Sequence, residues 1–249
     1  MENTTESYLR ATDENNIVHY KVGILAEGDH ISEGYEEVYL DYLRLRAKVY
    51  VDQTGMLSEE AILEDGTERD EDDYRSIHFG VIADNCSCSR VVAALRIILK
   101  SDLNMSTLPV ENYFPNLFSF CPISNGALEL SRYICTREYE TKQFELQWML
   151  LCRVMHYINE KNILQAYAVI ETSLERVFRT RGVPIKRLSE PQFVLKYRSY
   201  NIPVIFNIKL TARLMSLKYP RIFEKITESN DVFLHFKICG DNGVIYENN

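Results

Sequence analysis

The chain has 249 residues and contains no long apolar run. No stretch reaches the roughly 18 apolar residues that a membrane-spanning helix requires. The first six residues, Met-Glu-Asn-Thr-Thr-Glu, are acidic and polar, whereas a secretory signal begins with basic residues followed by an apolar segment. We therefore expect a cytoplasmic protein with no transmembrane segment.

Paired cysteines and nucleotide-binding glycine motifs are also missing. The six cysteines are scattered, and the pair at Cys86 and Cys88 is too tightly spaced for two zinc ligands. We therefore predict reduced thiols and no bound metal. Neither GxGxxG nor GxxxxGK[ST] occurs, so the sequence supports neither Rossmann nor P-loop nucleotide chemistry.

Charge is unevenly distributed along a chain whose net charge is −8. Residues 59–73 contain nine acids and one base, which leaves the rest of the chain neutral. Residues 176–198 contain seven bases and one acid. A local basic stretch in an acidic chain does not fit a duplex-DNA binder, so we expect no nucleic-acid partner. The stretch suits a smaller anion or an acidic protein, or it is a solvated helix face.

Apolar periodicity predicts alternating strands and helices. We expect a helix from Ser32, as N-cap, to about Val51, and then a hairpin that breaks at Asp84 and Asn85. The later pattern predicts a loop over 102–125, strands over 127–135, 165–170 and 202–210, helices over 142–160 and from Thr172 to Gly182, and weaker signals up to 238. This order predicts the α/β class, with a mixed central sheet and helices on both faces.

The same pattern suggests how the chain is divided. We expect a flexible N-terminus over residues 1–16, a main domain over 17–210 and a C-terminal extension over 211–249. The extension either covers the edge of the sheet or forms a dimer contact, and the sequence does not predict the oligomeric state.

Three motifs, in this order, resemble those of the acyl-homoserine lactone synthases, also called autoinducer synthases. They are Arg46-x-x-x-Tyr50, Glu68-x-Asp70-x-x-Asp73 and Glu129-x-Ser131-Arg132. Arg96 and Phe114 lie in segments that resemble the family's neighbouring strand and aromatic loop. The resemblance covers about residues 35–210 and implies a GNAT-like three-layer α-β-α sandwich.

The sequence departs from these synthases in ways that resemble a sister family. The tryptophan that follows their first motif is missing, and Met56 and Leu57 stand near its place. The segments 76–78, 170–184 and 196–203 resemble those of the N-acyl amino acid synthases, some of which accompany exosortase systems. Both families belong to the GNAT acyltransferase superfamily and differ in the amine acceptor.

The resemblance implies an enzyme, an N-acyltransferase that moves a fatty acyl group from a carrier thioester to the amine of an amino-acid-like small molecule. Acyl carrier protein or coenzyme A would be the donor, as a substrate and not as a bound cofactor. One alternative is an acyl-homoserine lactone synthase that consumes S-adenosylmethionine. Another, from a different class, is an inactive module that binds acyl carrier protein or lipid.

The third motif supplies the candidate catalytic residues Glu129, Ser131 and Arg132. Amine attack on a thioester needs a base, oxyanion donors and a proton for the leaving thiolate, but no covalent enzyme intermediate. Glu129 is the candidate base or amine anchor, and the alternative is a plain ion pair with Arg46 or Arg96. A β-bulge at Arg132 would re-aim its side chain and free a backbone N–H for the oxyanion.

The remaining candidates form three groups and a core histidine. Arg46, Glu68, Asp70, Asp73, Arg96 and Arg132 are expected to form one charge network, which either recognises the acceptor or locks the loop that carries its acids. Phe114 is expected to line an acyl tunnel with Leu146, Met149, Leu150 and Val169, or these residues are plain core. His78 is expected to be a satisfied core histidine. The donor-docking candidates are Arg176, Arg179, Arg181, Lys186 and Arg187.

Overall fold

The computed structural model describes residues 18–85, 88–100, 107–136, 143–229, 231–238 and 244–245. The predicted flexible segment 1–16 lies outside these residues, as does the segment 137–142 before the long helix. Within the described residues, no helix is long and apolar enough to cross a bilayer.

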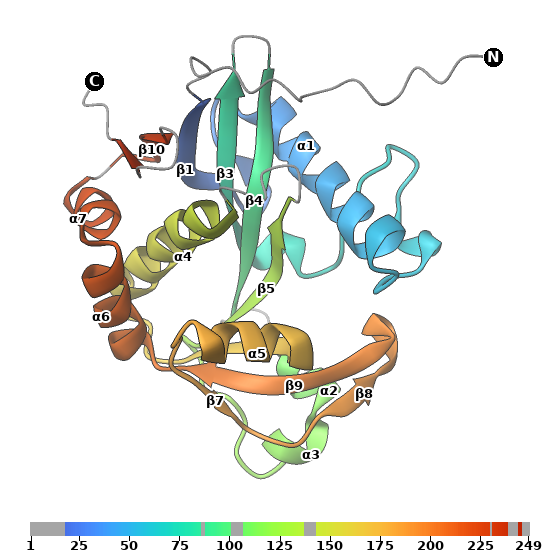
Figure 1. Cartoon of the computed structure of the whole chain (residues 1–249). Helices are drawn as coiled ribbons and strands as arrows, with labels where there is room; N and C mark the ends of the chain where they lie inside the picture. The colour runs from blue at the N-terminus through green and yellow to red at the C-terminus, as the bar shows by residue number, and fades with distance from the viewer. Residues whose placement is uncertain are drawn as a thin grey trace.

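One mixed sheet forms the middle layer (Figure 1). Its order is β11-β10-β1-β3-β4-β5-β6-β9-β7, and β2 and β8 pair with β1 and β9. β5 and β6 are parallel, and the other paired strands are antiparallel. The strands are β1 (Val18–Glu27), β2 (His30–Ile31), β3 (Ser76–Asn85), β4 (Cys88–Leu99), β5 (Leu128–Cys135), β6 (Ala166–Glu171), β7 (Ile185–Arg187), β8 (Gln192–Val194), β9 (Ser199–Phe206), β10 (Phe233–Ile238) and β11 (Val244–Ile245).

Helices cover both faces of this sheet, which confirms the predicted three-layer α-β-α architecture. α1 packs on one face, while α4 packs on the other with α6 and α7 against it (Figure 1). The helices are α1 (Glu36–Ala47), α2 (Pro109–Tyr113), α3 (Pro115–Phe118), α4 (Gln143–Glu160), α5 (Thr172–Thr180), α6 (Ile208–Lys218) and α7 (Pro220–Glu228).

The first helix differs from its prediction at both ends. Ser32 does not cap it, because the Ser32 hydroxyl donates to the carbonyl oxygen of Ile24 at 2.7 Å, and the helix begins at Glu36. After Ala47 the chain continues as a π-helical turn over Lys48–Gln53. Such turns are frequent at functional sites, and this one carries Tyr50 of the first motif.

The predicted hairpin is present, but its strands run through the expected break. Asp84 pairs with Ser89, and Asn85 pairs with Cys88. The Asp84 carboxylate accepts a hydrogen bond from the Ser89 hydroxyl and forms an ion pair with Lys21 at 2.6 Å. These contacts hold a turn-prone residue in strand conformation.

Two short helices occupy part of the segment that was predicted as a loop. Pro109 and Pro115 are the first residues of α2 and α3, a position that tolerates proline because its N–H has no partner within the helix. Glu111 fixes α2, because its carboxylate accepts hydrogen bonds from the backbone N–H groups of Leu108 and Ile123 and from Lys100.

The C-terminal region joins the central sheet. β10 pairs with β1, from Val18 with Ile238 to Gly23 with Phe233. Gly23 is required here, because a Cβ atom at this position would lie 2.3 Å from the carbonyl oxygen of Val232. The division of the chain into units at residue 210 stays a prediction.

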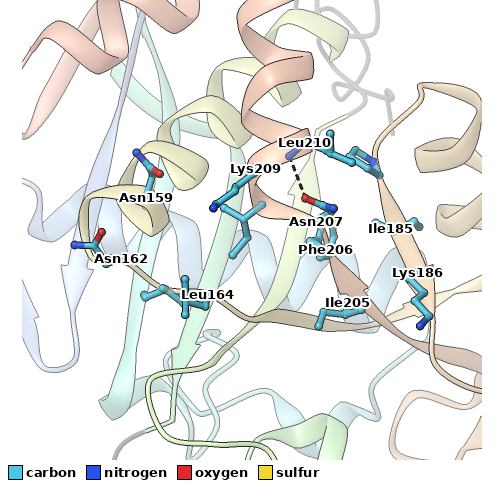
Figure 2. Close-up of a pocket in the computed structure, with 13 residues that line it drawn as sticks. Asn159, Asn162, Leu164, Ile185, Lys186, Ile205, Phe206, Asn207, Lys209 and Leu210 are labelled. Atoms are coloured by element: carbon cyan, nitrogen blue, oxygen red, sulfur yellow. Dashed lines mark hydrogen bonds between the residues drawn. The ribbon is translucent and has the colours of Figure 1, made fainter.

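An open cleft of about 710 Å³ lies between the C-terminal end of α4, β7, the end of β9 and the start of α6 (Figure 2). None of the motif residues named above lines it.

Candidate active site

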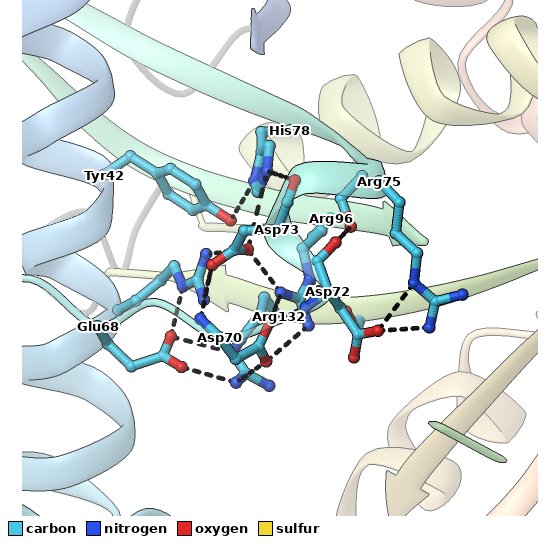
Figure 3. Close-up of polar contacts among 12 residues, drawn as sticks. Tyr42, Glu68, Asp70, Asp72, Asp73, Arg75, His78, Arg96 and Arg132 are labelled. Carbon is cyan, nitrogen blue, oxygen red and sulfur yellow. Dashed lines mark hydrogen bonds and ion pairs between the residues drawn. The ribbon is translucent and has the colours of Figure 1, made fainter. Parts of the chain in front are cut away.

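The predicted charge network exists and lies between α1 and the sheet (Figure 3). Arg46 comes from α1, Arg96 from β4 and Arg132 from β5, while the acids come from the loop that follows the π-helical turn. The structure brings all six predicted members together: Arg46, Glu68, Asp70, Asp73, Arg96 and Arg132.

Glu68 joins two of the arginines. Arg46 Nε donates to Glu68 Oε2 at 2.5 Å, and Arg132 donates to both carboxylate oxygens, with Nη2 2.7 Å from Oε1 and Nε 3.1 Å from Oε2. The Glu68 residue is 1% exposed. The two-point contact with Arg132 is the strong form of an arginine–carboxylate contact, so Glu68 fixes the plane of the Arg132 guanidinium.

Asp70 and Asp73 complete the network around Arg96. Arg96 Nη1 lies 2.5 Å from an oxygen of each aspartate. Arg132 also donates to Asp70 at 2.8 Å, and Arg46 donates to Asp73 at 2.8 Å. Three arginines therefore meet three carboxylates, and the charges balance.

Ionisation of these acids is maintained by the arginines. Burial alone would raise the pKa of Glu68, but Arg132 and Arg46 overcome it and hold the pKa below its ordinary value. The pKa of Asp70 is lowered strongly for the same reason, chiefly by Arg96 and Arg132. The pKa of Asp73 is also lowered strongly, chiefly by Arg46 and Arg96. All three carboxylates are therefore engaged and charged.

His78 lies at one end of the network and matches the expected core histidine. It is buried, with Nδ1 3.2 Å from the Tyr42 hydroxyl and Nε2 3.4 Å from the Asp73 carbonyl oxygen. Burial lowers its pKa to about 3, so the ring stays neutral at pH 7.

Glu129 lies on the same sheet face but has a different environment. Its residue is 1% exposed, and its Oε2 accepts a hydrogen bond from the backbone N–H of Val110 at 2.7 Å. Within the described residues it forms no ion pair, so the alternative of a plain pair with Arg46 or Arg96 is wrong. Burial raises the pKa of Glu129 to about 8, although the Val110 N–H opposes the shift.

The bulge predicted at Arg132 is confirmed. The β4–β5 register shifts between Ala94 and Arg96, and Arg132 has φ 51°, in the left-handed region. This conformation lets Arg132 join Arg96 and Ser131 on one side of the sheet, where the Ser131 hydroxyl accepts from Arg96 Nε at 3.0 Å. Tyr50 supports the bulge: its ring lies 5.3 Å from the Arg132 guanidinium, and its hydroxyl donates to the Tyr133 carbonyl oxygen at 3.2 Å.

Sequence reasoning missed a tyrosine pair beside Glu129. Tyr113 of α2 and Tyr197 meet edge to face, with ring centroids 5.2 Å apart and their hydroxyls hydrogen-bonded. Tyr197 precedes Arg198, which has φ 49°. Both tyrosines interact electrostatically with Glu129 and Arg132. No pattern marks them, because they lie in a five-residue helix and a single 3-10 turn.

The five residues expected around one acyl tunnel do not share a space. Leu146, Met149 and Leu150 of α4 belong to the main core cluster on the α4 side of the sheet. Phe114, which is 1% exposed, and Val169 pack in a separate cluster with Val110 and Tyr167. Their apolar character predicted contact with the core but not the sheet face that each one meets.

The predicted donor-docking residues have unequal surroundings. Glu175, one position before the basic stretch, binds Arg179 at 2.8 Å and Arg187 at 2.5 Å. Arg181 donates to Gln147, whereas Arg176 and Lys186 are exposed. Glu175 therefore offsets part of the charge expected to attract a partner.

Comparisons with known proteins agree with the motif order. Residues 31–204 match the family model described as autoinducer synthase. A curated acyl-homoserine-lactone synthase of Aeromonas hydrophila is 27% identical over 165 residues, which cover 64% of this chain and 74% of that protein.

Solved structures share the fold at low identity. The coenzyme A-dependent acyl-homoserine lactone synthase BjaI superposes with a TM-score of 0.63 and 20% identity, over 86% of this chain and 92% of its own. The AHL synthase LasI superposes with a TM-score of 0.58 and 17% identity, over 77% of this chain and 90% of its own. FeeM, an N-acyl amino acid synthase from uncultured soil microbes, superposes with a TM-score of 0.52 and 13% identity, over 78% of this chain and 95% of its own. The family match covers well over half of the chain, and the chain therefore belongs to the autoinducer synthase family of acyltransferases.

Proposed function

We propose that this family member transfers a fatty acyl group from a carrier thioester to the amine of an amino-acid-like acceptor, with Glu129 as general base. The environment of Glu129 supports this most: it is a buried carboxyl with a backbone donor, no ion pair among the described residues, and a pKa of about 8. A carboxyl with this pKa is present in both protonation states near neutral pH, which suits proton transfer.

In the proposed reaction the amine nitrogen attacks the carbonyl carbon of the thioester. A C–N bond forms, the carbonyl π electrons move to the oxygen, and Glu129 takes a proton from the amine. The oxyanion then collapses, the C–S bond breaks, and the leaving thiolate takes the proton from Glu129. An amide and a free thiol result, and Glu129 returns to its starting state.

The bulge has two roles in this proposal. A backbone N–H at the bulge stabilises the oxyanion, and Arg132, held by Glu68 and Asp70, keeps the bulge in place. The Ser131 hydroxyl holds the side chain of Arg96, its partner on β4, by accepting a hydrogen bond from it. The network then acts chiefly as a scaffold, because its acids are already paired with arginines.

Two classes of acceptor are compatible with the proposed reaction. An amino-acid acceptor agrees with the missing tryptophan and with the N-acyl amino acid synthase-like segments of the second half. S-adenosylmethionine is the second candidate, because the curated relative is an acyl-homoserine-lactone synthase. For the donor we propose acyl carrier protein, with exposed Arg176 and Lys186 as contacts, and coenzyme A is the alternative.

The test is mass spectrometry of lipids from a heterologous bacterium that expresses the chain or its Glu129→Gln variant. We expect new N-acyl amino acids with the wild type and at least roughly 100-fold less with the variant, because general-base catalysis contributes about 10²–10⁴-fold. Matching melting temperatures would show that the variant folds.

Other outcomes would change the proposal. Acyl-homoserine lactones would identify S-adenosylmethionine as the acceptor. Equal product from Glu129→Gln would exclude Glu129 as the base. A soluble protein that makes no new lipid but forms a complex with purified acyl carrier protein would favour a binding module.

A further inference from the structure

The open cleft lies outside the charge network, and its lining includes Pro184, the last residue of the segment 170–184, and the donor-docking candidate Lys186. Its volume of about 710 Å³ falls within the range of small-molecule sites. It is formed where α4 ends and α6 begins, beside β7 and the end of β9 (Figure 2).

The lining of the cleft combines an apolar floor with a basic rim. The apolar lining residues are Ile163, Leu164, Pro184, Ile185, Ile205, Phe206, Ile208 and Leu210. The polar lining residues are Lys186, Lys209, Asn159, Asn162 and Asn207, and no acid of the described residues lines the cleft. In Figure 2 the two lysines lie on either side of Ile205. This combination fits a ligand with an apolar chain and a negative head.

The two ammonium groups are free within the described residues. Neither Lys186 nor Lys209 has an ion pair or a side-chain hydrogen bond there. The nearby bases differ, because Glu175 binds Arg179 and Arg187, while Lys218 donates to the Arg181 carbonyl oxygen. Within the described residues, the positive charge of Lys186 and Lys209 is therefore not compensated by an acid.

Two further features favour such a ligand. Leu164 and Leu210 are 82% and 50% exposed at the cleft, so an apolar chain would remove their side chains from water. The N-terminus of α6 also opens here, where Asn207 Oδ1 accepts from the Leu210 N–H at 3.1 Å. The helix dipole adds partial positive charge to that of the lysines.

Strand register places the cleft at a distance from Glu129. Glu129 pairs with Tyr167, Tyr167 with Ile205, and Ile205 with Lys186, so all four lie in one row across β5, β6, β9 and β7. Three strand spacings correspond to about 14 Å. Two strands, β6 and β9, therefore separate Lys186 from the strand that carries Glu129.

We propose that this cleft binds a single-chain anionic amphiphile, a molecule with one alkyl chain and a carboxylate head. A free fatty acid and an N-acyl amino acid share this chemistry. The alkyl chain lies on the isoleucine floor, and the carboxylate lies at the rim, where Lys186 and Lys209 supply positive charge.

Calorimetric titration with decanoate, below its micelle concentration, tests the site directly. The double variant Lys186→Glu/Lys209→Glu should bind roughly tenfold more weakly or not at all, because two attractive charges become repulsive. The control Arg90→Glu/Lys196→Glu makes the same change in net charge at exposed positions away from the cleft and should bind like the wild type. Decyltrimethylammonium should not bind, and hexanoate should bind at least roughly tenfold more weakly than decanoate.

The Glu129→Gln variant separates this proposal from the proposed function. It should bind decanoate as the wild type does, whether or not the chain is an acyltransferase. The proposal is overturned if decanoate does not bind, if both charge-reversed variants bind equally, or if only Glu129→Gln abolishes binding, which would place the ligand in the active site. Titration with N-decanoylglycine then shows whether the free fatty acid or the N-acyl amino acid binds more tightly.

Discussion

At the scale of single residues, carboxyl groups on one sheet face have opposite pKa shifts. Glu68, Asp70 and Asp73 are buried against arginines, which hold their pKa values low. Glu129 is buried with a backbone N–H as its partner, and its pKa rises to about 8. The environment of each carboxyl therefore decides whether it is a fixed charge or a proton acceptor.

The raised pKa predicts the pH dependence of the reaction. The base is active when deprotonated, so kcat/KM should rise with pH until about 8 and then level off, falling about tenfold per pH unit below that value. The measurement is the pH profile of the purified wild type beside Glu129→Gln. A rise that persists unchanged in the variant would belong to the acceptor amine and would contradict this role.

At the scale of elements, turns hold the residues that the pattern could not predict. Long strands and helices follow from apolar periods of 2 and 3.6, and their order was predicted correctly. The π-helical turn, α2, α3 and the 3-10 turn before Arg198 are held by distant contacts such as that between Glu111 and Lys100. For this reason the network was predictable from motifs, whereas the Val110 N–H and the tyrosine pair were not. Glu175 lies in the predicted helix α5, but the sequence does not show which arginines it meets in space.

The turn at Arg198 gives a stability prediction. Arg198 is exposed with φ 49°, a left-handed conformation that costs a non-glycine residue about 1 kcal/mol. Arg198→Gly should therefore raise the free energy of unfolding in urea by up to about 1 kcal/mol. Arg213→Gly in α6 should lower it by about 1 kcal/mol, because glycine is unfavourable within a helix. Destabilisation by both variants would show that the turn is not strained.

At the scale of the whole molecule, the charge network connects α1, the acidic loop, β4 and β5. Breaking a buried pair on one side leaves a charge without a partner, which costs about 3–5 kcal/mol. Loss of activity in a network variant would therefore not show that the residue takes part in catalysis.

The prediction for the network concerns stability. Glu68→Gln should lower the free energy of unfolding at pH 7 by about 3–5 kcal/mol, because Arg46 and Arg132 lose their shared carboxylate. Glu64→Gln, an exposed acid in the same loop, should change it by less than about 0.5 kcal/mol. Urea unfolding of both variants makes the comparison, and equal values would mean that the network adds no stability.

The sign of the acid response follows from the lowered pKa values. The stability that these carboxylates contribute is present above their unfolded pKa of about 4 and is lost as the pH falls toward their lower folded values. The difference between wild type and Glu68→Gln should therefore shrink below pH 4.

The pairing of β10 with β1 also determines when the fold can be completed during synthesis. β1 leaves the ribosome more than 200 residues before its partner β10. Until then β1 has β3 on one side, and on the other side β2 covers only Ala26 and Glu27, so the edge from Val18 to Gly23 is open. The newly made chain therefore exposes a strand edge while more than 200 residues are added, and a variant truncated before residue 233 keeps that edge open.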